Sequence, residues 1–182
     1  MMIKFLIEEG ADQPKYYSEK ASGMDVTAFK ILKVFRGDRE IEPENLKKVQ
    51  EGFNERGYIK LRSLERILFG TGIKAILPEN TELQVRARSG MSLKRGLSVL
   101  NGPGTVDEDY QGEIGIILYN STPFLNKVEK GERIAQLVPA IVTRPDIEFI
   151  WENSPIDQQS YILGHDPYKD VRGEDGFGST DS

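Results

Sequence analysis

Short apolar runs separated by turn-forming residues recur through most of the chain, and they constrain its fold more than any other feature. Between Ile59 and Val142 the runs IKAIL, LQVRAR and RIAQLVPAIV are interrupted by turns such as Pro78-Glu79-Asn80 and Lys130-Gly131. Strands spaced by about 8 to 12 residues, with few helix signals, are typical of an antiparallel sandwich or barrel. Neither a GxGxxG nor a GxxxxGK[ST] pattern occurs, so a Rossmann or P-loop site is not supported.

The N-terminal third adds two strand-like segments and one helix. Residues 2–8 (MIKFLIE) and 26–35 (VTAFKILKVF) carry apolar, β-branched and aromatic residues, which favour strands. In the segment 37–60, Pro43 stands at a plausible helix start, apolar residues follow at helical spacing, and Gly57 is a stop signal. We therefore predict one short amphipathic helix of about three turns, inserted into the β domain and without chemistry of its own.

Composition excludes several kinds of chemistry. The 182 residues include no cysteine and one histidine, His165, which excludes disulfides and a thiolate nucleophile and argues against a Ser-His-Asp triad. A net charge of −5 argues against a nucleic-acid-binding face, and no stretch reaches the roughly 18 apolar residues of a membrane span. The N-terminus does not have the pattern of a signal peptide. We expect a cytoplasmic protein that binds neither nucleic acid nor membranes.

The stretch 86–120 concentrates the polar groups that suit a phosphate-bearing ligand. Arg88-Ser89-Gly90 offers a guanidinium, a hydroxyl and an unhindered backbone N–H in consecutive positions, a combination that suits phosphate oxygens. The tripeptide alone is a weak signal because short motifs match by chance.

A second group of polar residues lies in Asn101 to Tyr110, NGPGTVDEDY. Asn101 could pair with a pyrimidine edge, Asp107 could hold a water, and Tyr110 could lie against a sugar. The alternative is a hairpin whose acids are solvated and whose tyrosine belongs to the core. The residues of this stretch by themselves favour that alternative.

With almost no histidine and no cysteine, few mechanisms are open. An aspartate that activates water toward a metal-bound phosphate is the most economical. Mg²⁺ prefers oxygen ligands and keeps several of its waters, so Asp25 is a candidate outer-shell partner of the ion. The polar tail 151–182 is expected to be a loosely ordered arm, in which residues 172–180 (RGEDGFGST) combine an arginine and an aromatic with glycines and hydroxyls, as a phosphate and base clamp would.

The chain resembles the homotrimeric dUTP pyrophosphatases (dUTPases), whose five ordered motifs all have counterparts here. These counterparts are Ala21 to Asp25, Arg88 to Gly90, Asn101 to Gly112, Gly131 to Leu137, and Arg172 to Thr180. Thr71-Gly72 and Pro78 also match a segment of the family. The match takes in most of the chain outside residues 37–60.

This resemblance implies hydrolysis of dUTP to dUMP and pyrophosphate, with Mg²⁺ on the triphosphate. Asp107 would activate the attacking water, and Asn101 with backbone groups near Gly115 would read uracil. Tyr110 would pack under the deoxyribose and exclude ribose, and Phe177 would stack on the base. The remaining substrate contacts implied are Arg88, Ser89, Gly90, Thr105, Val106, Gln136, Arg172, Gly178, Ser179 and Thr180.

The family fold implied is a jelly-roll-like β-barrel, here residues 1–150, followed by a linker and arm at 151–182. Three sites would be shared between the subunits of a homotrimer, with each arm acting as a lid on a neighbour's site. A closing lid excludes water and places its side chains only when the right ligand is bound. Glu174 and Asp175 are expected to face solvent, since acids turned toward the triphosphate would weaken its binding.

Two alternatives remain beside this reading. The related dCTP deaminases place a glutamate ten residues after the counterpart of Asp107, where this chain has Ile117, which cannot transfer protons. A regulatory protein on the same fold could use the insert 37–60 to dock a partner, but every catalytic counterpart is present, which favours an enzyme.

Overall fold

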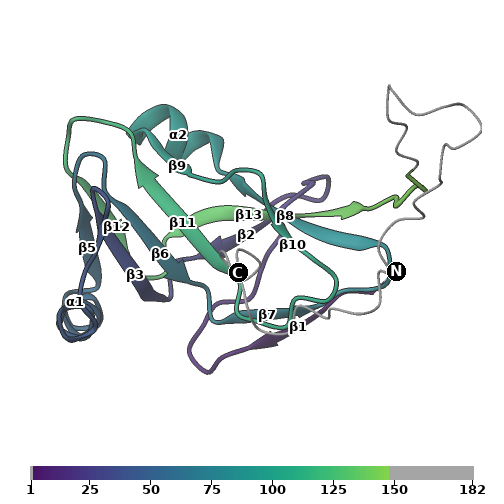
Figure 1. Cartoon of the computed structure of the whole chain (residues 1–182), viewed down its shortest axis with the longest axis horizontal. Helices are drawn as coiled ribbons and strands as arrows, with labels where there is room; N and C mark the ends of the chain where they lie inside the picture. The colour runs from purple at the N-terminus through teal and green to yellow at the C-terminus, as the bar shows by residue number, and fades with distance from the viewer. Residues whose placement is uncertain (1, 148–182) are drawn as a thin grey trace, which may run out of the picture.

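The computed structural model of the chain describes residues 2–147 and shows a predominantly β architecture (Figure 1). The strands in chain order are β1 (Lys4–Ile7), β2 (Met24–Thr27), β3 (Lys30–Arg36), β4 (Arg39–Glu40), β5 (Tyr58–Leu61), β6 (Arg66–Gly70), β7 (Ile73–Ile76), β8 (Thr81–Ala87), β9 (Leu97–Val99), β10 (Gly104–Val106), β11 (Gly115–Asn120), β12 (Asn126–Glu129) and β13 (Arg133–Ile141). The helices are α1 (Pro43–Arg56) and α2 (Ser89–Arg95). The expectation of an all-β domain is confirmed.

Two antiparallel sheets enclose the core. One has the order β10-β8-β13-β2 and the other the order β4-β3-β6-β11-β9, while β1-β7 and β12-β5 form two-stranded ribbons. Buried and half-buried residues alternate along β8 and β11, as expected for strands with one face against a core. Leu83, Val85 and Leu137 from the first sheet join Phe69, Ile116 and others from the second in one hydrophobic cluster.

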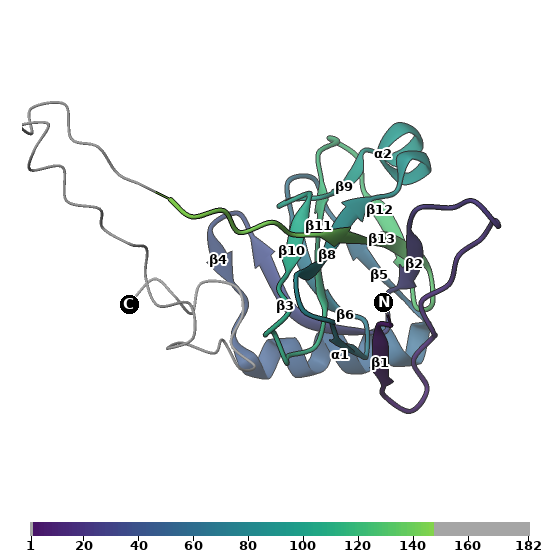
Figure 2. The same cartoon turned by 90° about the vertical axis from the view of Figure 1, so that its right-hand side faces the viewer.

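Helix α1 confirms the helix predicted in the insert. It begins at Pro43 and ends before Gly57, whose φ of 71° allows its N–H to bond to the Phe53 carbonyl. Phe53 is fully buried and contacts Phe69, with ring centroids 6.2 Å apart. Figure 2 shows α1 lying along one edge of the molecule, beneath β3 and β6. Tyr58–Lys60, the last residues of the predicted insert, belong to β5 and pair with β12.

The expectation of one continuous strand over residues 26–35 is wrong. The segment is divided into β2 and β3, which belong to different sheets. Between them, Ala28 N donates to the Glu132 carbonyl and Phe29 N to the Gly70 carbonyl. The chain therefore passes from one sheet to the other at these two residues, and neither is a glycine or proline that would predict a turn.

The expectation of a single helix is also wrong, because α2 follows β8 directly. It is seven residues long with one buried side chain, Met91, too short to show a helical apolar period. The sequence does contain residues typical of a helix C-terminus: basic Lys94 and Arg95 in the last turn, followed by Gly96, whose φ is 59°. Neither helix of residues 2–147 has the length and apolarity needed to cross a membrane.

Candidate active site

The start of α2 presents the Arg88-Ser89-Gly90 motif. Arg88 is the N-cap residue, and its carbonyl accepts the N–H groups of Met91 and Ser92. The first N–H groups of a helix have no intrahelical partner, and here they belong to Ser89 and Gly90, both exposed. A β carbon added at Gly90 would meet nothing within 4 Å, so there is open space above this backbone. The geometry suits an anion at the helix start.

Strand register brings three further motifs onto the sheet from which this helix begins. Thr105 of β10 lies opposite Gln84 of β8, and Gln136 of β13 lies opposite both Arg86 of β8 and Asp25 of β2. Directly opposed residues point to the same face of a sheet. Thr105, Gln136 and Asp25 therefore share the face turned away from the core, and the sheet assembles segments more than a hundred residues apart in sequence.

Gln84 and Arg86 belong to the same face, although sequence reasoning gave them no role. Arg86 Nε donates to Gln84 Oε1 at 3.0 Å, and Gln84 Nε2 donates to Glu82 Oε1 at 2.6 Å. The signal for them was the alternation in TELQVRA, where apolar Leu83 and Val85 are buried while Gln84 and Arg86, which follow them, are not.

The turn after β10 holds Asp107 and Tyr110. Tyr110 N donates to the Asp107 carbonyl at 3.2 Å, and the Tyr110 hydroxyl donates to the Glu113 carbonyl at 2.9 Å. Both residues are half-buried, and Tyr110 packs against the core cluster. The alternative prediction, that Tyr110 belongs to the core, is thus correct in part. Asn101, at the start of the same stretch, is exposed.

Gly115 opens β11 on the far side of this turn and is braced by the Thr71-Gly72 segment. Thr71 is fully buried, and its Oγ1 donates to the Ile114 carbonyl at 2.7 Å. Gly72 has a φ of 70°, and a β carbon there would lie 2.6 Å from Ala11 Cβ. Thr71 and Gly72 therefore fix the backbone leading into Gly115, which explains why a threonine and a glycine stand there.

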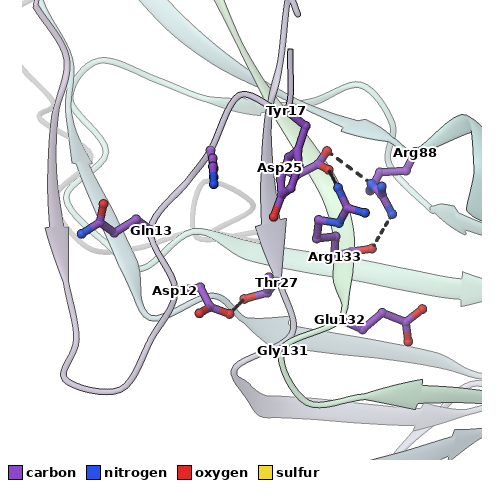
Figure 3. A pocket seen from close by; sticks show the side chains of 10 residues that line it. Asp12, Gln13, Tyr17, Asp25, Thr27, Arg88, Gly131, Glu132 and Arg133 are labelled. Atoms are coloured by element: carbon purple, nitrogen blue, oxygen red, sulfur yellow. Dashed lines mark hydrogen bonds and ion pairs between the residues drawn. The ribbon is translucent and has the colours of Figure 1, made fainter.

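Asp25 lies at the centre of a charged cluster beside a cavity of about 560 Å³ (Figure 3). Its carboxylate is only 6% exposed and accepts a hydrogen bond from Arg133 Nη1 at 3.0 Å. Arg88 Nε lies 3.2 Å from the other carboxylate oxygen, an ion pair without hydrogen-bond alignment. Arg88 Nη1 donates to the Arg133 carbonyl at 3.0 Å. The guanidinium of Arg88 thus ties α2 to β2 and β13.

Two members of this cluster were not predicted. The Arg133 guanidinium carbon lies 4.0 Å from the centroid of the Tyr17 ring, close enough for a cation–π contact. Arg133 lies within the fourth motif, which could have indicated a role for it. No feature of the sequence indicated a role for Tyr17.

Asp25 does not make a protein-bound magnesium site. Among the residues described, no group of three or more His, Cys, Asp or Glu side chains is placed to hold a metal ion. Each oxygen of Asp25 already faces a guanidinium, which satisfies the charge that would attract a cation. The donor set therefore fits a structural ion-pair cluster rather than direct coordination of Mg²⁺, and the expected outer-shell contact of Asp25 through water stays a prediction.

Two cavities within residues 2–147 each contain some of the predicted site residues. The cavity in Figure 3 includes Asp25 and Arg88, while Tyr110 lines another of about 460 Å³ with Glu108 and Gln111. Arg172, Phe177, Gly178, Ser179 and Thr180 lie outside the described residues, as do the remaining positions of the predicted arm.

A sequence model of the dUTPase family matches residues 54–180. The chain belongs to the dUTPase family. A deoxyuridine 5'-triphosphate nucleotidohydrolase of Fusobacterium nucleatum is 38% identical over 180 residues, covering 99% of this chain and 97% of the relative. The corresponding protein of Gloeothece citriformis is 37% identical over 174 residues, covering 96% and 92%.

Solved dUTPase structures share the fold. The dUTPase of Streptococcus mutans has a TM-score of 0.58 at 21% identity, covering 78% of this chain and 98% of that one. A mutant dUTPase of phage phi11 of S. aureus, described as showing the coordination of a structural Mg(II) ion, has a TM-score of 0.61 at 17% identity, covering 84% and 99%. The jelly-roll-like dUTPase fold expected for this chain is thereby confirmed.

Proposed function

We propose that this dUTPase-family protein hydrolyses dUTP to dUMP and pyrophosphate. The observation that carries the proposal is the register of the β10-β8-β13-β2 sheet, which places the strand leading to Asp107 beside the strand leading to Ser89 and Gly90. Because β10 and β8 are antiparallel, Asp107 follows the end of β10 that lies next to the start of β8, whereas Ser89 and Gly90 follow the other end of β8. Within one chain the proposed base and the anion-binding helix start therefore lie at opposite ends of this strand pair, which supports sites shared between subunits. Gln136, on the adjacent strand, adds a further polar group to the same face.

In the proposed reaction, Asp107 takes a proton from a water as the water oxygen attacks the α-phosphorus. The bond from the α-phosphorus to the bridging oxygen breaks, and pyrophosphate leaves with the bonding electrons. Ser89 and Gly90 at the helix start, with Gln136, hold phosphate oxygens. Thr105 and Val106 form the strand that delivers Asp107. Val106 is buried, so this strand is anchored in the core and limits the movement of the base.

Selectivity in this proposal comes from two sides of the nucleotide. Asn101 and the backbone at Gly115 read uracil, and Tyr110 packs under the deoxyribose. The hydrogen bond of the Tyr110 hydroxyl to the Glu113 carbonyl holds the ring in place. A ribose 2′-hydroxyl would therefore clash with the ring, because the ring cannot move aside. Arg172, Phe177, Gly178, Ser179 and Thr180 close over the triphosphate and base.

Magnesium enters this reaction with the triphosphate, as part of the substrate complex. Because Asp25 is engaged by Arg88 and Arg133, its proposed part is to hold the helix start in position rather than to bind the ion. The two cavities that separately contain Arg88 and Tyr110 support sites completed by neighbouring subunits of a homotrimer. Molecular mass in solution tests that assembly, and a monomer with full activity would contradict it.

Pyrophosphate release from dUTP, dCTP, dTTP and UTP, measured with Mg²⁺, tests the activity. We expect a strong preference for dUTP and a loss of about 10²- to 10⁴-fold in kcat for Asp107→Asn. Asp38→Asn, which makes the same change at an exposed turn, is the matched control and should keep the wild-type rate. Weak preference for dUTP, or an active Asp107→Asn protein, would overturn the proposal.

Truncation tests whether residues 171–182 contribute to turnover. A chain that ends at Asp170 is expected to keep its assembly state and lose most of its turnover, because the proposed lid is missing. Unchanged turnover would remove the arm from the mechanism.

Deamination of dCTP has no support from the structure. Ile117, at the position where deaminases have a glutamate, lies in β11 opposite Leu68 and carries no group that can transfer a proton. Release of ammonia from dCTP is the direct measurement, and we expect none.

A further inference from the structure

The inserted helix forms part of a third cleft, of about 550 Å³. Its apolar floor is built from four elements: Val34 of β3, Val49 of α1, Ile59 of β5 and Ile67 of β6. Phe53 anchors α1 to the core, so the wall that α1 supplies is fixed. Figure 1 places α1 and β5 at one end of the molecule, away from β10 and β2. None of the proposed catalytic or substrate-binding residues lines this cleft.

The rim of the cleft is strongly basic. It carries Arg36, Arg56, Lys60 and Arg62 and a single acid, Glu65. Glu65 is already engaged, since it pairs with Arg36 at 3.2 Å and accepts the Arg62 backbone N–H at 2.7 Å. Within residues 2–147 the side chains of Arg56, Lys60 and Arg62 have no ion-pair or hydrogen-bond partner. In a chain with a net charge of −5, this concentration of unpaired cations produces a local field that attracts anions.

The position of the Arg56 guanidinium depends on the absence of a side chain at Gly52. Gly52 is buried inside α1, and a β carbon on it would lie 2.4 Å from Nη2 of Arg56. The guanidinium therefore rests against the bare backbone at Gly52. Glycine is among the poorest helix formers, and any other residue here would push the guanidinium away. This arrangement keeps Arg56 against the helix at the edge of the cleft.

We propose that this cleft binds a small amphipathic anion, a molecule with an apolar body and one sulfonate, carboxylate or phosphate group. The volume lies within the range of about 300 to 1,000 Å³ found for small-molecule pockets. The body would lie on the apolar floor while the anionic group meets the guanidinium and ammonium groups of the rim. Charge complementarity favours an anion, and the apolar floor favours a ligand that is more than a bare inorganic ion.

Binding of 1-anilinonaphthalene-8-sulfonate to the full-length protein, followed by fluorescence and by calorimetry, tests this proposal. We expect one saturable site per chain. Arg56→Gln and Arg62→Gln should each weaken binding about tenfold, the loss expected for one charge-assisted contact. Gly52→Ala should also weaken it by displacing Arg56, without lowering the thermal midpoint, since alanine is the better helix former.

Two controls separate the cleft from general effects. Lys47→Gln removes the same charge from an exposed position of α1 that does not line the cleft, and it should leave the affinity unchanged. The uncharged analogue N-phenyl-1-naphthylamine should bind at least tenfold more weakly. Non-saturable binding, equal losses in Lys47→Gln and Arg56→Gln, no loss in any cleft variant, or equal affinity for the uncharged analogue would each overturn the proposal.

Discussion

The carboxylate of Glu113 accepts a hydrogen bond from the backbone N–H of Gly72, with 2.6 Å between Oε1 and the nitrogen. The other carboxylate oxygen lies 3.0 Å from Lys30 Nζ, and Lys30 also pairs with Glu8. One side chain thus connects the Gly72 turn, β3 and the end of β1 to the loop that carries Tyr110 and leads to Gly115. Glu113 is a positioning residue for the proposed base- and sugar-binding groups.

Glu113→Ala is expected to destabilise the protein by about 1 to 3 kcal/mol, because the Gly72 N–H loses its acceptor in a partly buried place. The KM for dUTP should rise as the Tyr110 loop loses its brace. Urea unfolding and steady-state kinetics measure the two effects. Glu79→Ala, at an exposed turn, is the matched control, and equal effects of the two substitutions would contradict the role given to Glu113.

Stability at alkaline pH should depend on Lys30. Burial lowers the pKa of Lys30, but hydrogen bonds and charge interactions with Glu8 and Glu113 outweigh that effect and raise the pKa above 10.5. Since the folded-state pKa is the higher one, the stabilisation is fully present below pH 10.5 and is lost as pH rises through the folded-state value. The unfolding free energy of the wild type should therefore fall above this pH more steeply than that of Lys30→Met. Parallel pH curves for the two proteins would refute the contribution, and Lys20→Met provides the exposed control.

Asp25→Asn is expected to cost about 3 kcal/mol in unfolding free energy, because it leaves two partly buried guanidinium groups without their counter-charge. The Mg²⁺ concentration for half-maximal dUTP hydrolysis should stay unchanged, since Asp25 is proposed to position Arg88 and not to bind the ion. Chemical denaturation and a magnesium titration distinguish these roles. A large shift in the magnesium dependence would restore Asp25 as a partner of the metal.

Asn120 is a buried centre of hydrogen bonding, and its removal should lower stability. It is fully buried, and its amide serves both as donor and as acceptor. Its hydrogen-bond partners are the Leu61, Arg62 and Phe124 carbonyls, Thr122 N, Thr122 Oγ1 and Asn126 Nδ2. Asn120→Ala leaves several buried groups unpaired, and we expect a loss of about 3 kcal/mol or more. Differential scanning calorimetry, with Asn45→Ala on the exposed surface of α1 as control, measures it. A similar thermal unfolding midpoint for Asn120→Ala and Asn45→Ala would contradict the stabilising role proposed for Asn120.

Local patterns predicted the parts of this fold whose causes are local. The limits of α1 follow from Pro43 and Gly57, and the all-β class follows from the short apolar runs separated by turn-forming residues. The turn between β2 and β3 was missed because what ends β2 is a hydrogen bond from Ala28 to the carbonyl of Glu132, a residue far along the chain. Helix α2 was missed because a single buried side chain leaves no period to detect.

The candidate site was predictable to a similar extent. The ordered motifs identified the positions of Ser89, Asp107 and Gln136, and the sheet register shows how three motifs come to be neighbours. The pairing of Asp25 with Arg88 and Arg133 was not predictable, since it depends on contacts between two strands and the start of α2. The cleft beside α1 was missed for the same reason, because its cations come from separate elements and only folding brings them together.

Strand β13 lies between β8 and β2, and the Arg133–Asp25 contact joins residues 108 positions apart. During synthesis β2 therefore leaves the ribosome long before its partner strand exists. At about 5 to 20 residues per second, the delay is roughly 5 to 20 seconds. Through that time the edges of β2 and β8 remain open to other chains, and such long-range pairing is slow even once the partner is made. Chains that terminate before Arg133 keep these edges permanently open, and we expect them to aggregate more readily than chains that contain β13.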